Sequence, residues 1–333
     1  MAQAALFDAD LPPASGGVQP AAVGAELRAL AARLHQRFGG RLHLGTSSWH
    51  FPGWAGQVYG RAYPEARLSR EGLAAYAQHP LLNTVSLDRA FYRPLDPGTY
   101  RALAAQVPAS FRFVVKAPAL LSDATERDAA TGAALRENPQ FLDADAAVAL
   151  CARPAAEGLC DRLGVLVWQL SPLPRRWLED EPALLRRLGR LWQAVEAVLP
   201  RQAQQALELR DPSLLTPTLA ATLKFHGVRP VLGLHDRMPA AEAQLPLLRA
   251  TWPGDLVCRW NLQRGQRYAQ ARDAWAPFDR LQSEDLATRQ TLVKVVIATL
   301  QAGRAAFITI NNKAEGCAPA SVLALAQALD RAA

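Results

Sequence analysis

This chain of 333 residues lacks several kinds of segment that would point directly to a function. No stretch of about 18 uninterrupted apolar residues occurs, so we expect no transmembrane helix and no membrane partner. No basic segment followed by an apolar one is visible near the start, so we expect no secretory signal and a cytoplasmic location. The sequence also has no GxSxG nucleophile motif, P-loop or dinucleotide-binding fingerprint, and therefore no motif assigns a cofactor.

Cysteine and histidine are both scarce. The four cysteines are Cys151, Cys160, Cys258 and Cys317. They form no CxxC pair and have no histidine at zinc-finger spacing, so we expect reduced, mostly buried thiols. Of the six histidines, only His50 and His235 lie near predicted strand ends, and His235 and Asp236 alternate in direction. A multinuclear metal site needs several His and carboxylate ligands, so the sequence argues against a metal.

Lysine is rare as well. Only four of the 37 basic residues are lysines, and they are Lys116, Lys224, Lys294 and Lys313. The excess of arginine, together with the many alanines, indicates a skewed genomic composition. The net charge of +7 and the pI near 9.6 are therefore weak signs of a nucleic-acid partner, although they are compatible with an anionic ligand.

Short apolar runs alternate with helical patterns along the chain. Residues 1–22 are rich in Ala, Pro and Gly and are predicted to be disordered. Residues 23–38 have leucines at helical spacing and stop at Gly39-Gly40, which predicts one amphipathic helix. Eight strand candidates follow, at 42–48, 83–91, 111–117, 164–170, 206–210, 230–236, 255–261 and 306–312.

Helical patterns such as 184–198 and 284–302 separate most of these runs. Eight strands that alternate with helices indicate parallel βαβ units and favour a closed α/β barrel of the (β/α)8, TIM-like type over an open sheet. We therefore divide the chain into a flexible arm plus helix (1–40) and a single barrel domain (41–333).

The predicted strands begin with apolar residues and end with polar ones. In a parallel barrel all carboxyl ends meet at one rim, where active sites are found. The polar residues expected at this rim include Asp88, Lys116, Gln169, Arg210, His235, Arg259, Asn261, Asn311 and Asn312. The stretch "AFITINNKAEG" shows the pattern most clearly, because a buried-looking strand ends abruptly in two amides and Lys313.

Two charged groups are candidates for chemistry at the rim. Glu208 and Arg210 are two residues apart on one strand, so both point into the barrel, where they either neutralise each other or leave Arg210 to hold an anion. Lys116 and Lys313 end or follow strands, and they either pair with carboxylates or serve an anionic ligand. Glu208 and Lys116 are the candidates for proton transfer.

Other rim residues are candidates for ligand contacts. Arg259 and Asn261 share one face, and with Asn311, Asn312 and Lys313 they form either a phosphate site or a polar network that closes the rim. An aromatic group could stack on a base or a sugar, or could pack under loops. Its members are Trp49, Trp54, Phe91 and Tyr92.

Several motifs in order resemble one family. They are "LGTSSWHFPGWAGQVY" (44–59), "NTVSLDRAFYRPL" (83–95), "FRFVVKAP" (111–118), "LGVLVWQLSPLP" (163–174), "LELRDPSLL" (207–215) and "ITINNKAEGCAP" (308–319). The chain is similar here to the YecE-like proteins, also called domain of unknown function 72. The resemblance implies a TIM-like barrel but no established activity.

The sequence departs from the pattern of that family at three positions. Ser86, Asn261 and Lys313 stand where members often have Glu, His and His. If the family uses those residues for chemistry, the resemblance implies that this chain is altered or binds without catalysis.

Two functions follow as hypotheses. In the first, the rim binds a phosphorylated sugar or nucleotide-like molecule, with hydrolase or isomerase-type chemistry. In the second, the chain is a non-catalytic bacterial protein associated with nucleic acid. Residues 3–7 read "QAALF" and resemble the peptide by which bacterial replication and repair proteins dock on the sliding clamp. Gln3, Leu6 and Phe7 would be the docking residues.

Overall fold

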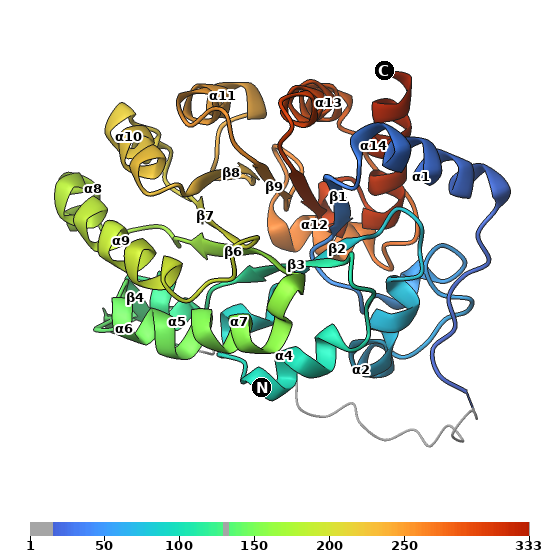
Figure 1. Cartoon of the computed structure of the whole chain (residues 1–333), viewed down its shortest axis with the longest axis horizontal. Coiled ribbons are helices and arrows are strands. Elements are labelled where there is room, and N and C mark those ends of the chain that lie inside the picture. Colours follow the sequence, from blue (N-terminus) through green and yellow to red (C-terminus); the bar gives the residue numbers. More distant parts are fainter. Residues whose placement is uncertain (1–15, 129–132, 333) are drawn as a thin grey trace.

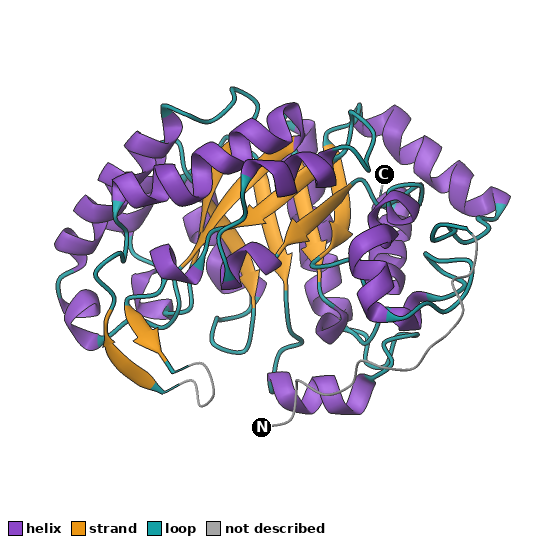
Figure 2. Ribbon diagram, turned by 90° about the horizontal axis from the view of Figure 1, so that it is seen from below, coloured by secondary structure: helices purple, strands orange, loops and turns teal. Residues whose placement is uncertain are grey.

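The computed structural model describes residues 16–128 and 133–332. At its centre is a closed barrel of parallel strands in the order β1-β10-β9-β8-β7-β6-β3-β2, enclosed by helices (Figure 2). The strands are β1 (Leu42–Thr46), β2 (Thr84–Leu87), β3 (Arg112–Lys116), β6 (Leu163–Gln169), β7 (Gln204–Glu208), β8 (Arg229–Leu234), β9 (Leu256–Trp260) and β10 (Ala306–Ile310). The predicted TIM-like barrel is confirmed. Five of the eight predicted runs contain one of these strands, and the other three overlap β6, β7 and β8, which begin one or two residues earlier than predicted.

Helices surround the barrel, and Figure 1 shows α9, α10, α11 and α13 following one another around the strands. The longer helices are α1 (Ala25–Phe38), α2 (Glu65–Tyr76), α4 (Pro97–Ala104), α7 (Arg153–Leu159), α9 (Glu181–Glu196), α10 (Pro217–Phe225), α11 (Ala241–Ala250), α12 (Tyr268–Trp275), α13 (Leu286–Gln301) and α14 (Ala318–Arg331). The short ones are α3 (Arg89–Tyr92), α5 (Ala119–Ser122), α6 (Ala144–Ala147) and α8 (Arg175–Glu179). A separate antiparallel hairpin, β4 (Thr125–Arg127) and β5 (Ala134–Glu137), lies between β3 and β6 in the chain.

Helix α1 matches the predicted amphipathic helix. It ends at Gly39, whose φ of 59° is in the left-handed region and lets its N–H bond to the carbonyl of His35. Leu30, Leu34 and Phe38 are buried. Arg33 forms an ion pair of 2.6 Å with Asp330 of α14, so α1 is attached to the last helix of the barrel.

Part of the arm that we expected to be disordered is held on the barrel. The N–H of Ala21 bonds to the carbonyl of Val58, and the N–H of Gly60 bonds to the carbonyl of Gln19, both at 2.9 Å. Val18 is 9% exposed. The physical reason is that these backbone groups find partners in the loop that follows β1, which the composition of the arm does not reveal.

Side-chain caps fix where several helices begin. Asp or Thr accepts a hydrogen bond from the backbone N–H three residues later at the start of α4, α6, α9, α10 and α13. Each such cap contributes roughly 1 kcal/mol of stability relative to alanine. The helices therefore start at defined points, and the lengths of the loops that form the carboxyl rim are fixed.

The barrel interior is apolar in its lower part. Valines from β3, β6, β8 and β9 pack there against Ala206 and Phe307. Gly45 of β1 allows a close approach between strands, because a Cβ atom at this position would lie 1.9 Å from the carbonyl oxygen of Thr84 in β2. The polar strand ends stand above this apolar layer.

Two further expectations concern the chain as a whole. All four cysteines are free thiols, and three are buried while Cys160 is exposed, so the predicted mostly buried thiols are confirmed. Within residues 16–128 and 133–332, no helix is both long and apolar enough to cross a membrane.

Candidate functional site

Glu208 is the centre of an ion-pair network at the carboxyl ends of the strands. It is fully buried at the end of β7, and its Oε1 lies 2.6 Å from Arg210 and accepts a hydrogen bond of 3.1 Å from Asn261. Its Oε2 accepts a hydrogen bond from Arg259. Burial alone would raise the pKa of Glu208, but the charges of Arg210, Arg259 and Lys116 outweigh burial and lower it to about 2.

Arg259 connects this carboxylate with a second one. It is 1% exposed, and its Nη2 lies 2.6 Å from Oδ1 of Asp88, which also accepts a hydrogen bond of 2.7 Å from Ser86. Burial disfavours the charged guanidinium, yet Asp88 and Glu208 more than compensate and raise the pKa of Arg259. Arg259 therefore holds two carboxylates in place, and its Nη1 and Nη2 are both occupied.

Arg210 and Gln169 extend the network to β6. Nη2 of Arg210 donates to Oε1 of Gln169 at 2.9 Å, and its Nη1 donates to the carbonyl of Leu209 at 2.9 Å. His235 lies near the network, where burial and the charge of Arg210 lower its pKa to about 4, so the ring is neutral near pH 7. We call the following residues the mouth network: the bonded residues Ser86, Asp88, Gln169, Glu208, Arg210, Arg259 and Asn261, together with Lys116, whose pKa responds to their charges.

Lys116, at the end of β3, has an unusual environment. It is 9% exposed, and its Nζ lies 3.5 Å from the ring centroid of Phe91, the cation–π geometry. It forms no hydrogen bond or ion pair with any of the described residues. Burial, partly offset by Asp88 and reinforced by Arg259, lowers its pKa to about 8.

Asn311 and Lys313 lie at the neighbouring end of β10. Nδ2 of Asn311 donates to the hydroxyl of Ser47 at 2.7 Å, and its Oδ1 accepts from the backbone N–H of Lys313 at 3.0 Å and from its Nζ at 3.3 Å. Burial and then the charge of Arg272 lower the pKa of Lys313 to about 8, while Asp88 opposes them. The charge of Asp88 therefore acts on both Lys313 and Lys116.

Two predicted site residues do not lie with the others. Asn312 is 1% exposed, and its Oδ1 accepts from the indole of Trp54 at 3.1 Å and from the first N–H of α14 at 2.8 Å. Trp49 is 2% exposed and donates to the carbonyl of Leu68. Both support the loops around the barrel and do not present polar groups or a ring face to the mouth.

The remaining predicted residues divide between the surface and the undescribed arm. Tyr92 is 86% exposed, next to Phe91, which lies under Lys116. Gln3, Leu6 and Phe7 lie outside the described residues. Reasoning from the sequence missed the contribution of Ser47 and the contact between Phe91 and Lys116. In the sequence, Ser47 appears only as a polar residue directly after β1. The contact between Phe91 and Lys116 depends on where α3 lies in the fold, which the sequence does not give.

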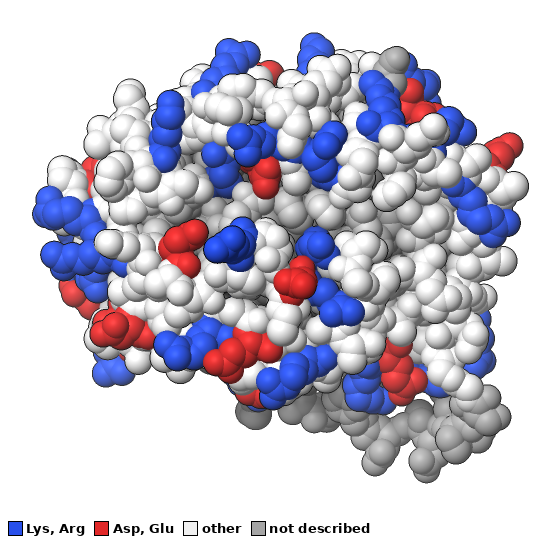
Figure 3. Space-filling model, viewed as in Figure 1, with Lys and Arg blue, Asp and Glu red and all other residues white. Residues whose placement is uncertain are grey.

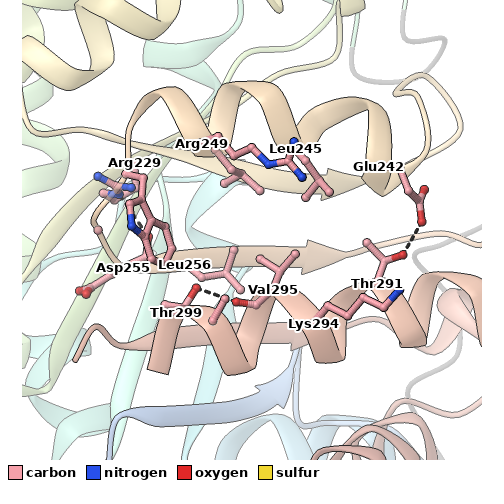
Figure 4. A pocket seen from close by; sticks show the side chains of 14 residues that line it. Arg229, Glu242, Leu245, Arg249, Asp255, Leu256, Thr291, Lys294, Val295 and Thr299 are labelled. Atoms are coloured by element: carbon pink, nitrogen blue, oxygen red, sulfur yellow. Dashed lines mark hydrogen bonds between the residues drawn. The ribbon is translucent and has the colours of Figure 1, made fainter. Parts of the chain in front are cut away.

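A hollow of about 630 Å³ lies outside the barrel, between α11 and α13 (Figure 4). Leu245, Leu248 and Val295 form part of its apolar wall. Arg229 and Asp255, at the amino-terminal ends of β8 and β9, border it. Because the mouth network lies at the carboxyl ends of the strands, this hollow is a separate feature. Within the described part of the chain, no three His, Cys, Asp or Glu side chains are placed to hold a metal ion.

A family model described as protein of unknown function DUF72 matches residues 43–333. The chain belongs to the DUF72 family. A DUF72 family protein from Enterococcus faecalis, solved at 3.10 Å, is 18% identical over 87% of this chain and 95% of that one, with a TM-score of 0.56. A DUF72 family protein from Thermotoga maritima, solved at 2.20 Å, is 17% identical over 87% and 98% of the two chains, with a TM-score of 0.54. At these identities the likeness shows the fold alone. No curated protein matches this DUF72 chain.

Proposed function

We propose that this DUF72 protein binds a small anionic ligand, a phosphorylated sugar or a nucleotide-like molecule, in the mouth of its barrel. The observation that supports the proposal is the charge balance of the mouth network. Three cationic side chains, Lys116, Arg210 and Arg259, stand against two carboxylates, Glu208 and Asp88. Both carboxylates are engaged by arginines, so the charge of Lys116 has no bonded counterion in the network.

A buried cation without a bonded anion is costly, and a ligand oxyanion would lower that cost. The amides on either side offer complementary groups. Gln169 uses its Oε1 for Arg210, which leaves its NH2 as a donor, and Asn261 uses its Nδ2 for Glu208, which leaves its oxygen as an acceptor. This combination suits a molecule that carries a phosphate and hydroxyl groups.

The contacts also redistribute the expected chemical roles. Glu208 accepts bonds on both oxygens and has a pKa of about 2, so at neutral pH it is a carboxylate with little capacity to take a proton. Its role is to position Arg210 and Arg259. Lys116, with a pKa of about 8, is the better candidate for proton transfer in hydrolase or isomerase-type chemistry.

The test is thermal stabilisation by inorganic phosphate and by ribose 5-phosphate. A ligand that binds only the folded chain stabilises it by about 2.7 kcal/mol at 100 times its Kd. We expect a rise in Tm for the wild type and for Lys224→Met, an exposed control, and a much smaller rise for Lys116→Met. Equal rises in all three proteins would contradict the proposal.

The alternative, association with nucleic acid, has less physical support. Figure 3 shows Lys and Arg side chains spread over the drawn face and interspersed with Asp and Glu, without one continuous basic band. Nonspecific binding to nucleic acid depends on such a band of cations along the phosphate backbone. The clamp-docking hypothesis rests on Gln3, Leu6 and Phe7, and binding of the full chain to a bacterial sliding clamp, compared with its triple alanine variant, tests it.

A further inference from the structure

The two carboxylates whose charges act on Lys116 already bind other side chains. Both oxygens of Glu208 are engaged, by Arg210, Asn261 and Arg259. Asp88 uses Oδ1 for Arg259 and Ser86, and its Oδ2 has no bond to a described residue. Lys116 therefore feels the charges of both carboxylates and bonds to neither, and the ring face of Phe91 is its close partner among the described residues. A lysine that served only to balance charge would be expected to form such a bond.

The surroundings of Lys116 favour its neutral form. Burial disfavours the ammonium, and the charges of Arg259 and Arg210 act in the same direction, so the pKa is about 8. At pH 7 roughly 10% of the side chain is then the free amine, far more than for a lysine with the usual pKa. Desolvation and a nearby cation are the two means by which proteins turn a lysine into a nucleophile.

We propose that Lys116 forms an imine with the carbonyl carbon of a phosphorylated aldehyde or ketone bound in the barrel mouth. This inference rests on the proposed anion site and names its substrate class. Lys313 and the amides of Gln169 and Asn261 would contact the phosphate and hydroxyl groups. Lys116, the network cation without a bonded counterion, would react.

The step balances without an oxidant or reductant. The lone pair of neutral Nζ adds to the carbonyl carbon, the π pair moves to oxygen, and that oxygen takes up a proton to give a carbinolamine. Nζ then loses a proton, and the hydroxyl takes up a proton and leaves as water while the lone pair of Nζ forms the C=N bond. An amine, a carbonyl and one proton thus become a protonated imine and water, and loss of that proton gives the neutral imine. Asp88, whose charge acts on Lys116 and whose Oδ1 bonds to Arg259, would accept and return the proton.

An imine at this position would explain why the site holds so many cations. A protonated imine withdraws electrons from the adjacent carbon, which makes removal of a proton or cleavage of a carbon–carbon bond there easier. The isomerase-type chemistry considered for the site is of this class. The arginines fix the carboxylates and keep Lys116 from forming a permanent ion pair.

The scarcity of lysine makes the test clean. The full chain is incubated with pyridoxal 5′-phosphate, an aldehyde that carries a phosphate, reduced with sodium borohydride, and digested for mass spectrometry. Only four lysines and the terminal amine can react. We expect at least tenfold more adduct at Lys116 than at the exposed Lys224 and Lys294, and more adduct as the pH rises toward 8. Lys116→Arg, which keeps the charge but forms no stable imine, should lose this adduct only.

The outcomes separate the two proposals. Adduct at Lys116 no greater than at Lys224 in the wild type would overturn the imine, and this result does not depend on whether the variant folds. A rise in Tm with inorganic phosphate but no adduct at Lys116 would overturn the imine and leave anion binding standing. Loss of the Lys116 adduct when inorganic phosphate competes would support both.

Discussion

Arg259 and Glu208 form a buried ion pair inside the barrel, and their side chains are 1% and 0% exposed. They come from β9 and β7, with β8 between them. Gly233 of β8 is paired in register with Arg259, and a Cβ atom there would already be in ordinary contact with Glu208 and Arg210. The pair therefore requires a small residue at this position.

Replacing Glu208 by Gln should destabilise the fold strongly. The change keeps the size of the side chain but leaves Arg210 and Arg259 without their shared carboxylate. Breaking a buried pair in this way costs about 3–5 kcal/mol. Urea unfolding measures the loss. Glu179→Gln is the control, because its pair with Arg175 is exposed and should change stability by less than about 0.5 kcal/mol. Equal small losses in both variants would contradict this account.

Glu208 should also make the fold sensitive to acid. Its pKa of about 2 lies below the value near 4.5 of an unperturbed Glu, so its contribution is present above pH 4.5 and is lost as the pH falls toward 2. A shift of this size corresponds to about 3 kcal/mol. Unfolding free energies measured between pH 5 and pH 2 should fall more steeply for the wild type than for Glu208→Gln. Parallel curves would show that another carboxylate is responsible.

Strand alternation explains how much of this site could be predicted. The period of two placed Glu208 and Arg210 on one face, and the structure pairs them. The same period would have allowed only one of the neighbours Asn311 and Asn312 to face the mouth. Asn311 has that position, and Asn312 points outward to cap α14.

Other relationships depend on contacts that no local pattern contains. Arg259 bonds to Asp88 across 171 residues, and the strand pattern gives neither the partner nor the distance. Trp49 is in a loop, where hydrophobic periodicity does not apply, and it is buried because the loop folds back toward α2. Loop residues were therefore the least reliable part of the predicted site.

Two glycines that point into the barrel should respond very differently to alanine. At Gly45 a Cβ would lie 1.9 Å from a backbone oxygen of Thr84, which cannot move without separating β1 from β2. At Gly233 the nearest atom would be 3.6 Å away, an ordinary contact. We expect Gly45→Ala to cost about 3 kcal/mol or to prevent folding, and Gly233→Ala to cost less than about 1 kcal/mol. Thermal unfolding compares them, and similar Tm values would refute the distinction.

Gly233→Leu extends the same argument to the mouth. Its side chain would reach beyond Cβ into the space of Glu208 and Arg210. Overpacking of this kind costs about 1–3 kcal/mol, and here it would also displace the ion pair. We expect a lower Tm than for Gly233→Ala and a loss of stabilisation by phosphate. Unchanged phosphate binding in a folded Gly233→Leu protein would place the ligand elsewhere.

Lys116 should lower the stability of the fold at neutral pH, as a residue kept for function would. Its pKa is lowered from 10.5 to about 8, so between these values the unfolded chain binds more protons and stability rises with pH. Below pH 8 the deficit is about 3 kcal/mol, and the contact with Phe91 returns about 1 kcal/mol. Lys116→Met keeps the apolar stem and should therefore be about 2 kcal/mol more stable than the wild type at pH 7.

That advantage should disappear as the pH approaches 10.5, whereas exposed Lys224→Met should differ little from the wild type at either pH. Denaturant unfolding at pH 7 and pH 10 measures both effects. A Lys116→Met protein that is less stable than the wild type at pH 7 would contradict this account, because it would show that Lys116 stabilises the barrel.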